Sequence, residues 1–506
     1  MRGWSRSGRL GSLLFFSLSW LFLLGLTTTA AASKPNIVLI MADDLGWQDL
    51  GYHGSEIETP HIDSLAESGL VLERFYVQPI CSPTRAAVMT GKSAARLGLY
   101  QPISKLDPGG LPLEETLMPE FLSAGGYQAL MVGKWHLGHA ERAYFPQARG
   151  FEHFYGHVTG GIGYWDHNHG GGHDWQRNGV TVREEGYATR LIADEAVRLL
   201  EGRDRDRPTF LLASFNAPHL PNEAPDSSLA PYPDSLEQKR RLHAGMVSEL
   251  DVAVGRILAK LSEQGMRNNT LVWFFSDNGG LNPAASPEGL VSLMDTLVDF
   301  FGAPLPLEGL EFVRSNVQDG ASDNGPLRAG KAAVYEGGIR VPSVMAWPAQ
   351  VEAGSSHAFV TAQDVLPTVL QAVGLGGRIP EDLDGVSRWA AIRADEEPDP
   401  ERDLTPDFRV QGLGQVGLIR WPWKLVVPTP PLPWMEATPE LYNILEDPRE
   451  EDDRAGEEPE RVEMLQAALE AQPLGPSVHA SILSVALDPD SFGGPEDRAP
   501  WAEAAR

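Results

Sequence analysis

A lone cysteine begins a short segment whose residue types could do chemistry. It is the single cysteine in 506 residues, and it lies in Cys81-Ser82-Pro83-Thr84-Arg85. An intramolecular disulfide is therefore excluded. Pro83 is well placed to open a helix, so we expect Cys81 at a helix N-terminus, where free amides and the helix dipole favour an anion. Arg85 lies one turn further on, and these neighbours favour a reactive centre that meets an oxyanion over a buried structural thiol.

Two pairs of oxygen-bearing side chains each follow an apolar run. Asp43 and Asp44 form the first pair, and Asp277 and Asn278 form the second. Adjacent carboxylates repel each other unless a cation lies between them. Carboxylate and amide oxygens suit a hard divalent ion such as Ca²⁺ or Mg²⁺. Either pair alone is more typical of a helix cap or a turn, but together with Cys81 they predict a metal site.

The elements that must position these side chains alternate along the chain. Apolar runs predict buried strands at residues 36–41, 127–132, 209–215, 271–275 and 343–347. Helical patterns lie between them, and the clearest has an apolar stripe from Leu242 to Leu261. This alternation predicts an α/β fold with a large, mostly parallel sheet sandwiched between helices. Ligands of such sheets bind at the carboxyl ends of strands, where both oxygen-bearing pairs are expected.

Net charge limits the classes of partner. The chain carries a formal charge of -28 at pH 7. This charge argues against broad binding to nucleic acid or to anionic membranes. Because an acidic surface repels an anionic substrate, such a substrate would need a locally basic site.

The first 32 residues have the three parts of a secretory signal peptide. Three arginines precede an apolar run at residues 13–26, and three alanines end the segment at Ala32. We predict cleavage after Ala32 and export to the periplasm or the medium, with an uncleaved signal anchor as the alternative. No other stretch is long and apolar enough to span a bilayer, so stable membrane insertion is not expected after cleavage.

A change of composition divides the rest of the chain. Residues 380–406 are rich in Asp, Glu and Pro and read as a connection. Strand-like pieces and a helical pattern follow, at residues 408–410, 417–420, 424–427 and 459–471. We therefore expect a signal peptide at residues 1–32 and a catalytic domain at 33–395. A small α+β domain with a short antiparallel sheet is expected at 396–475, followed by a tail at 476–506.

The segment at Cys81 resembles the signature of the type I sulfatases, a family of the alkaline-phosphatase-like superfamily. That signature is Cys-x-Pro-x-Arg followed by four residues and Thr-Gly. Further motifs of the family follow in order: Gly133-Lys134-Trp135-His136, Pro218-His219-Leu220-Pro221, Gly330-Lys331, Glu336-Gly337-Gly338-Ile339-Arg340, Trp423-Lys424-Leu425 and Glu440-Leu441-Tyr442-Asn443. The resemblance covers almost all of the mature chain. Within the family, residues 241–280 look most like arylsulfatase B, an N-acetylgalactosamine-4-sulfatase.

The resemblance implies a sulfuric ester hydrolase that acts on an aryl sulfate or on a sulfated sugar or polysaccharide. It implies that a formylglycine-generating enzyme oxidises Cys81 to formylglycine (3-oxoalanine). One Ca²⁺, or alternatively Mg²⁺, would be bound per chain by Asp43, Asp44, Asp277, Asn278 and the side chain at position 81.

The resemblance also implies how the catalytic residues share the work. One hydroxyl of the hydrated aldehyde attacks sulfur with help from Asp277. Arg85, Lys134 and Lys331 neutralise the sulfuryl oxygens. His219 and Lys331 protonate the leaving oxygen, and His136 helps to deprotonate the second hydroxyl. Glu336 and Arg340 are expected to be structural.

Several alternatives stay open at this level. A phosphomonoester or phosphonate ester hydrolase on the same scaffold is one, and an unmodified relative that binds sulfated glycans is another. Residues 281–329 form an insertion whose apolar stretch at 290–301 either shapes substrate access or packs on the domain. The loop at residues 160–175 is either a polar lining of the site or a second metal site, since it carries His167, His169 and His173 beside Asp166 and Asp174.

Overall fold

The computed structural model describes residues 34–105, 107–169, 172–283, 318–396, 406–429 and 438–479. The predicted signal peptide and the apolar stretch at 290–301 lie outside the described residues. Within the described ranges, no helix has both the length and the apolar character needed to cross a membrane.

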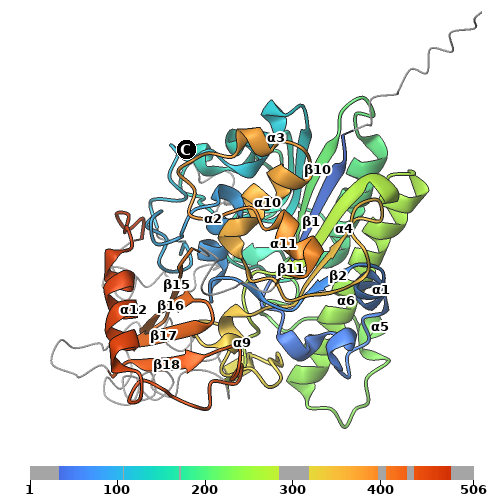
Figure 1. The fold of residues 1–506 in the computed structure, drawn as a ribbon. Coiled ribbons are helices and arrows are strands. Elements are labelled where there is room, and N and C mark those ends of the chain that lie inside the picture. Colours follow the sequence, from blue (N-terminus) through green and yellow to red (C-terminus); the bar gives the residue numbers. More distant parts are fainter. Residues whose placement is uncertain are drawn as a thin grey trace, which may run out of the picture. The chain divides into compact units, whose positions relative to one another are not determined.

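A ten-stranded sheet, in the order β13-β2-β12-β11-β1-β10-β4-β5-β8-β9, forms the centre of the fold (Figure 1). Its neighbours from β11 to β5 are parallel. Four of these five parallel strands were predicted from apolar runs: β1 (Asn36–Ala42), β4 (Gln128–Lys134), β10 (Thr209–Ser214) and β11 (Thr270–Ser276). The fifth predicted strand, β12 (Ser343–Ala346), pairs antiparallel with β11. The remaining members are β2 (Leu70–Leu72), β5 (His153–His157), β8 (Gln176–Arg177), β9 (Val180–Thr181) and β13 (Gly354–Ser356).

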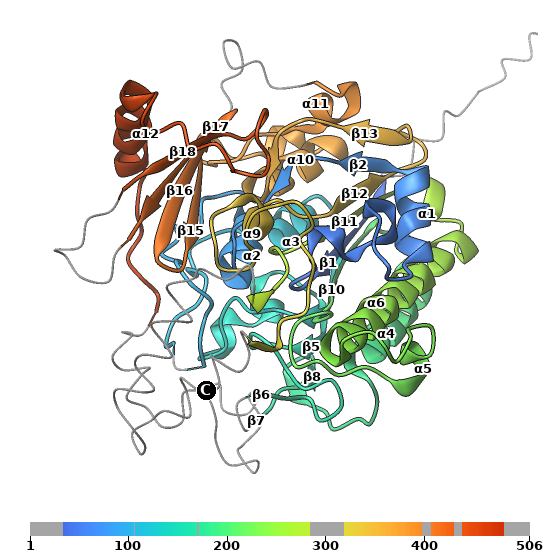
Figure 2. The same cartoon turned by 90° about the horizontal axis from the view of Figure 1, so that it is seen from below.

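Helices cover both faces of this sheet, as the apolar strands require (Figure 2). Alternate residues of β1 show the division, because Val38 belongs to the apolar cluster of one face and Leu39 to that of the other. The Val38 face packs against α1 (Pro60–Ser68), α4 (Ala188–Gly202) and α6 (Gln238–Glu263), with α5 (Asp226–Leu229) against α6. The Leu39 face packs against α2 (Cys81–Thr90), α3 (Met118–Ala124), α10 (Val365–Ala372) and α11 (Trp389–Ala394).

A second, antiparallel sheet follows near the C-terminus, as predicted. It contains β15 (Phe408–Gly412), β16 (Gln415–Arg420), β17 (Trp423–Pro428) and β18 (Glu440–Asn443). The helix α12 (Pro459–Ala471) buries Leu465 and Leu469 against one face of this sheet. The other face packs against Val334 and Ile339. Both lie in the segment from Gly330 to Arg340, which contains two of the family motifs. The small sheet therefore contacts a loop that the sequence assigns to the active site, while the domain boundaries stay a prediction.

Short elements complete the fold. They are β3 (Phe75–Tyr76), β6 (Asn168–His169), β7 (Gly172–His173), β14 (Val360–Thr361), α9 (Glu336–Ile339) and the 3-10 helices η1 (Trp47–Asp49), η2 (Gly51–His53), η3 (Arg142–Tyr144), η4 (Pro146–Arg149), η5 (Arg267–Asn269), η7 (Ala362–Asp364) and η8 (Gly376–Arg378).

Candidate active site

The predicted site residues meet at the carboxyl edge of the parallel strands. Asp43 and Asp44 follow β1, Asp277 and Asn278 follow β11, and Lys134 is the last residue of β4. Each strand is an apolar run that ends in polar residues at this one edge, which is why segments far apart in the sequence converge here.

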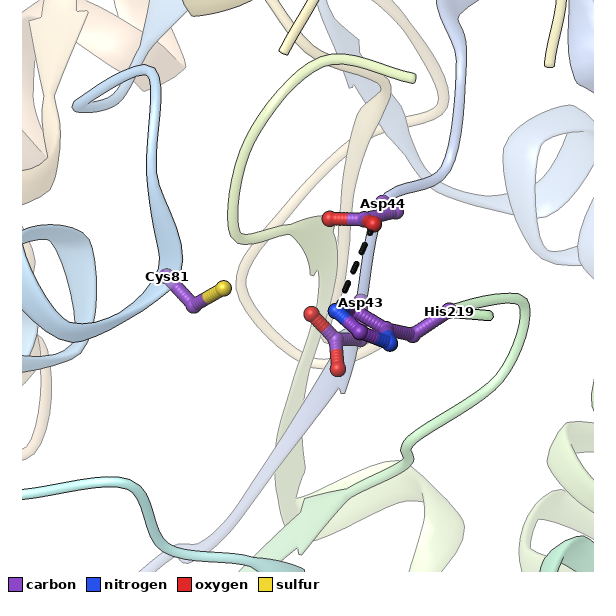
Figure 3. A group of neighbouring side chains, drawn as sticks. All are labelled: Asp43, Asp44, Cys81 and His219. Atoms are coloured by element: carbon purple, nitrogen blue, oxygen red, sulfur yellow. Dashed lines mark ion pairs between the residues drawn. The ribbon is translucent and has the colours of Figure 1, made fainter. Parts of the chain in front are cut away.

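Asp43 and Asp44 lie between Cys81 on one side and His219 on the other (Figure 3). Cys81 is the first residue of α2, so the helix begins two residues before the proline that predicted its start. Ligand atoms of Asp43, Asp44, Cys81 and His219 all lie within 4.8 Å of one another. The thiol is 2% exposed, and burial raises its pKa to about 11 against the opposing charges of Lys134 and Lys331.

Asp43 and Asp44 are each bound by a lysine. Lys134 Nζ donates to Asp43 Oδ2 at 2.6 Å, with both side chains fully buried. Lys331 Nζ donates to Asp44 Oδ2 at 2.7 Å, and Asn278 Nδ2 donates to Asp44 Oδ1 at 2.7 Å. Burial opposes the ionisation of Asp44, but Lys331 and the nearby His219 hold its pKa well below the ordinary value. Asp44 also has a left-handed φ of 65°, a strained conformation for a residue that is not glycine.

Arg85 joins Asp277, which belongs to the second oxygen-bearing pair, to the parallel sheet. Its Nε and Nη2 lie 2.9 and 2.7 Å from Asp277 Oδ2, and its Nη1 donates to Ser214 Oγ and to the Lys134 carbonyl. Burial, together with the neighbouring Asp43, raises the pKa of Asp277 to about 6 against the pull of Arg85. The guanidinium is thus fixed by groups from three strands, which leaves it little freedom.

His219 and Lys331 give the site its contact with solvent. Their side chains are 22% and 14% exposed, whereas Asp43 and Lys134 are not exposed at all. His219 Nδ1 donates to the Leu220 carbonyl at 2.7 Å, so its Nε2 is the nitrogen that faces Asp44 Oδ2, 3.7 Å away. Burial, followed by the charge of Lys331, lowers the pKa of His219 to about 3.

His136 is held in one tautomer, and its backbone carbonyl accepts from Ser82, the residue after Cys81. Because a carbonyl can only accept, His136 Nε2 donates to the Ile103 carbonyl at 3.0 Å. His136 Nδ1 is buried and has no hydrogen-bond partner among the described residues. Burial, then Lys134 and Arg85, lowers the pKa of this imidazole well below its ordinary value. A neutral ring with an available Nδ1 can accept a proton or a hydrogen bond.

The carboxylates and the amide fit a hard divalent cation. Asp43 Oδ1 and Asn278 Oδ1 are buried and lack a hydrogen-bond partner in the described part of the chain. Buried oxygens of this kind are costly unless a donor or an ion satisfies them. The donor set contains oxygens, apart from the thiol at position 81, as Ca²⁺ and Mg²⁺ prefer.

Three contributors were missed at the level of sequence. Ser214 ends β10 and accepts from Arg85, so the carboxyl-edge rule could have identified it. Ser82, inside the cysteine motif, donates to the His136 carbonyl and accepts from the Ile103 amide. Gly160 lies against His136, since a Cβ there would come within 2.7 Å of Nε2, and no local signal marks this approach.

The histidine-rich loop forms hydrogen bonds within itself and with the segments that flank it. His167 Nε2, His169 Nδ1 and His173 Nε2 bind the carbonyls of Gly186, Gly161 and Val182. Asp174 accepts from the amides of Val158 and Thr159, and Asp166 from that of Asn168. Among the described residues, the one group with metal-binding geometry is the Asp43 group. These contacts favour the polar-loop interpretation over a second metal site.

A buried ion network connects the site to the small sheet. Lys424 Nζ lies 2.9 Å from Glu336 Oε1 and 2.6 Å from Glu450 Oε1, and none of the three side chains is exposed. Tyr76 donates to Glu336 Oε2 at 2.8 Å, and the Glu336 amide donates to Glu450 Oε2 at 2.7 Å. Glu336 therefore anchors its loop to β17. Arg340 Nη1 lies 3.8 Å from Glu336, in line with the structural role expected for both.

Comparison with known proteins agrees with this arrangement. The model of the Sulfatase family matches residues 35–375. Arylsulfatase J of Mus musculus is 33% identical over 376 residues, which are 72% of this chain and 56% of that protein. The N-acetylgalactosamine-6-sulfatase of Mus musculus is 32% identical over 431 residues, 79% of this chain and 74% of that protein. The chain thus spans little more than half the length of arylsulfatase J.

Solved structures agree as well. The crystal structure of Ps i-CgsB has a TM-score of 0.73 and 29% identity, and covers 89% of this chain and 96% of its own. Its complex with k-i-k-neocarrahexaose has a TM-score of 0.74 and 28% identity, and covers 91% of this chain and 98% of its own. The predictions of the fold class and of a sulfatase are confirmed, whereas the finer likeness to arylsulfatase B stays a prediction. The chain belongs to the sulfatase family.

Proposed function

We propose that this protein hydrolyses sulfate monoesters of sugars. The observation that carries the proposal is the convergence of Cys81, an aspartate pair, an aspartate–asparagine pair and three cationic side chains at one edge of the sheet. Relatives named for N-acetylgalactosamine 6-sulfate, and a similar structure that contains a carrageenan hexasaccharide, support sulfated carbohydrate as the substrate class.

Three cationic side chains provide donors for an anionic substrate in this acidic protein. Each of them also pairs with an aspartate, so the site would become net positive when it binds the divalent cation. The chain carries a net charge of -28, but Arg85, Lys134 and Lys331 gather around Cys81. Fixed cations of this kind stabilise the charge on the sulfuryl oxygens more strongly in a buried site than in water. Ser214 and Asp277 hold Arg85 in place for this contact.

We propose that Cys81 is converted to formylglycine by a formylglycine-generating enzyme. The hydrated aldehyde supplies one hydroxyl that attacks sulfur and a second whose deprotonation expels sulfate. The site also suits one Ca²⁺ or Mg²⁺ on Asp43, Asp44, Asp277, Asn278 and residue 81, which would polarise a sulfate oxygen when bound. We propose further that the N-terminal segment directs export.

The surrounding residues hold the protons of the reaction. Asp277 takes up the proton of the attacking hydroxyl, since its carboxylate is one of the charged groups around position 81. His136 Nδ1, which is available in its fixed tautomer, accepts the proton of the second hydroxyl. Lys331 lies on the solvent side and protonates the leaving oxygen. His219 shares this role once its Nε2, which carries no proton in the observed tautomer, has taken one up from solvent.

Turnover of two small esters tests this function. We expect the enzyme to hydrolyse 4-nitrophenyl sulfate faster than 4-nitrophenyl phosphate, and the Cys81→Ala variant to hydrolyse neither above background. Preference for the phosphate would favour a phosphomonoesterase instead. Binding of sulfated glycans without turnover of any sulfate ester would identify an unmodified binding relative.

A further inference from the structure

Trp165 is placed unusually for a tryptophan. Its side chain is 50% exposed, and among the described residues it is the one tryptophan in the exposed class. Exposure of so large an apolar surface to water is unfavourable unless something covers it in use. Trp165 lies in the loop between β5 and β6, next to Tyr164.

The indole is held by a buried aromatic base. The ring centroid of Trp165 lies 5.2 Å from that of Tyr187, with the two planes tilted by 56°. Tyr187 in turn stacks on Tyr164 at 5.0 Å and 18°. Tyr187 is 2% exposed, and its hydroxyl donates to the Glu223 carbonyl at 2.8 Å. Trp165 is therefore supported on one side and open on another, which limits the conformational entropy that it would lose on binding a ligand.

The same loop packs against His219. Tyr164 Oη donates to the carbonyls of Asn216 and His219, at 2.9 and 2.8 Å. A Cβ on Gly161 would lie 3.0 Å from His219 Cε1. Trp165 is thus the chain neighbour of a tyrosine that binds the Pro-His loop. His219 of that loop is one of the two residues through which the site contacts solvent.

The proposed chemistry fixes which part of the substrate lies there. The leaving oxygen is protonated on the side of the site where Lys331 and His219 lie, so the alcohol part of the ester extends past His219 and away from Cys81. In a sulfated oligosaccharide that part is a sugar ring with further rings attached. The apolar C–H face of a pyranose matches an exposed aromatic ring, and its hydroxyls remain in water.

We propose that Trp165 binds an uncharged sugar ring next to the sulfated one, which makes this enzyme selective for sulfated oligosaccharides over isolated sulfated sugars. Asp166, which is also exposed, disfavours a second sulfate at that ring. This inference rests on the proposed function, because it assigns the position of the leaving group from His219.

Paired substrates separate this role from a structural one. The experiment compares kcat/KM for a carrageenan hexasaccharide, and for a chondroitin sulfate hexasaccharide whose neighbouring rings carry carboxylates, with that for N-acetylgalactosamine 6-sulfate and 4-nitrophenyl sulfate. The proposal predicts that the wild type prefers the carrageenan hexasaccharide. We expect Trp165→Ala to lower kcat/KM about tenfold on the hexasaccharide that the wild type hydrolyses, mainly through KM, and to leave the two small esters unchanged. Trp165→Phe retains most of the activity, and Val252→Ala, which removes an equally exposed side chain on α6, has no effect.

Three results would overturn the proposal. They are no loss in Trp165→Ala, an equal loss on all substrates, and wild-type turnover of 4-nitrophenyl sulfate without turnover of either hexasaccharide. In each of these cases sulfate ester hydrolysis itself would stand. Failure to hydrolyse any sulfate ester would instead remove the proposed function, and this inference with it.

Discussion

Two regions of this protein pair lysines with buried carboxylates for different ends. In the active site, Lys134 and Lys331 bind Asp43 and Asp44. At the junction with the small sheet, Lys424 binds Glu336 and Glu450. We define the junction by these last three residues.

The two regions differ in what is left unsatisfied. At the junction, three of the four carboxylate oxygens accept a hydrogen bond, and the fourth, Glu450 Oε1, has no hydrogen bond but lies 2.6 Å from the Lys424 cation. The side chains of the junction are sealed from solvent. In the site, Asp43 Oδ1 and Asn278 Oδ1 have no partner among the described residues, and Lys331 and His219 reach solvent. A satisfied buried network fixes a fold, whereas an unsatisfied one with access to solvent can bind an ion and a substrate.

Removal of the metal should have the largest effect on turnover, and it should affect the active site and not the junction. We expect dialysis against a chelator to reduce turnover at least about 10³-fold, because the ion supplies several kcal/mol of charge stabilisation. Ca²⁺ or Mg²⁺ should restore turnover and raise the midpoint of thermal unfolding. The measurement is turnover and metal content before and after dialysis. Full activity in metal-free protein would contradict the metal site.

Lys424→Met should unfold the protein more readily. The change leaves Glu450 buried without a cation and Glu336 with Arg340 alone, 3.8 Å away. Breaking such a network costs about 3–5 kcal/mol of unfolding free energy. Denaturant unfolding measures this loss. If the loss were below about 1 kcal/mol, the range of an exposed ion pair, the junction would not be a stabilising element.

Lys331→Met is the matched change in the site. We expect kcat/KM to fall about 10²–10³-fold, since one cationic donor to the substrate is removed. The unfolding free energy should change little, because Lys331 reaches solvent and Asn278 still donates to Asp44. Steady-state kinetics and denaturant unfolding of the same preparation check both parts. A stability loss as large as that of Lys424→Met would remove the distinction between the regions.

The pH dependence of stability should show the charge imbalance of the junction. Burial, with the neighbouring Glu336, raises the pKa of Glu450 to about 7 against the attraction of Lys424. The pKa of Glu450 is higher in the folded than in the unfolded protein. Its contribution to the free energy of unfolding is therefore complete below the ordinary carboxyl pKa of about 4.3 and is lost as pH rises through about 7. We expect a loss of about 1–3 kcal/mol between about pH 5 and pH 8. Glu450→Gln should reduce the dependence of the unfolding free energy on pH between about pH 5 and pH 8. An unchanged slope in this variant would contradict the assignment of the pH dependence to Glu450.

The sequence predicted the parts of this molecule that local pattern encodes. Apolar runs located β1, β4, β10 and β11, and the residues after them formed the site because parallel strands end at one edge. Pro459 and the pattern after it located α12 with both ends.

Long-range pairing could not be predicted from local pattern. The antiparallel direction of β12 depends on its partner strand, which its own residues do not specify. Likewise, nothing near Lys424 indicates that Glu336, 88 residues away, accepts from it. The polar Gly160 loop approaches His136 for the same reason, through packing that only the folded chain defines.

The chemical state of residue 81 tests the central claim most directly. Mass spectrometry of the peptide that contains Cys81, taken from fractions of different specific activity, should find the aldehyde in proportion to activity. A free thiol at position 81 in fully active enzyme would contradict the account.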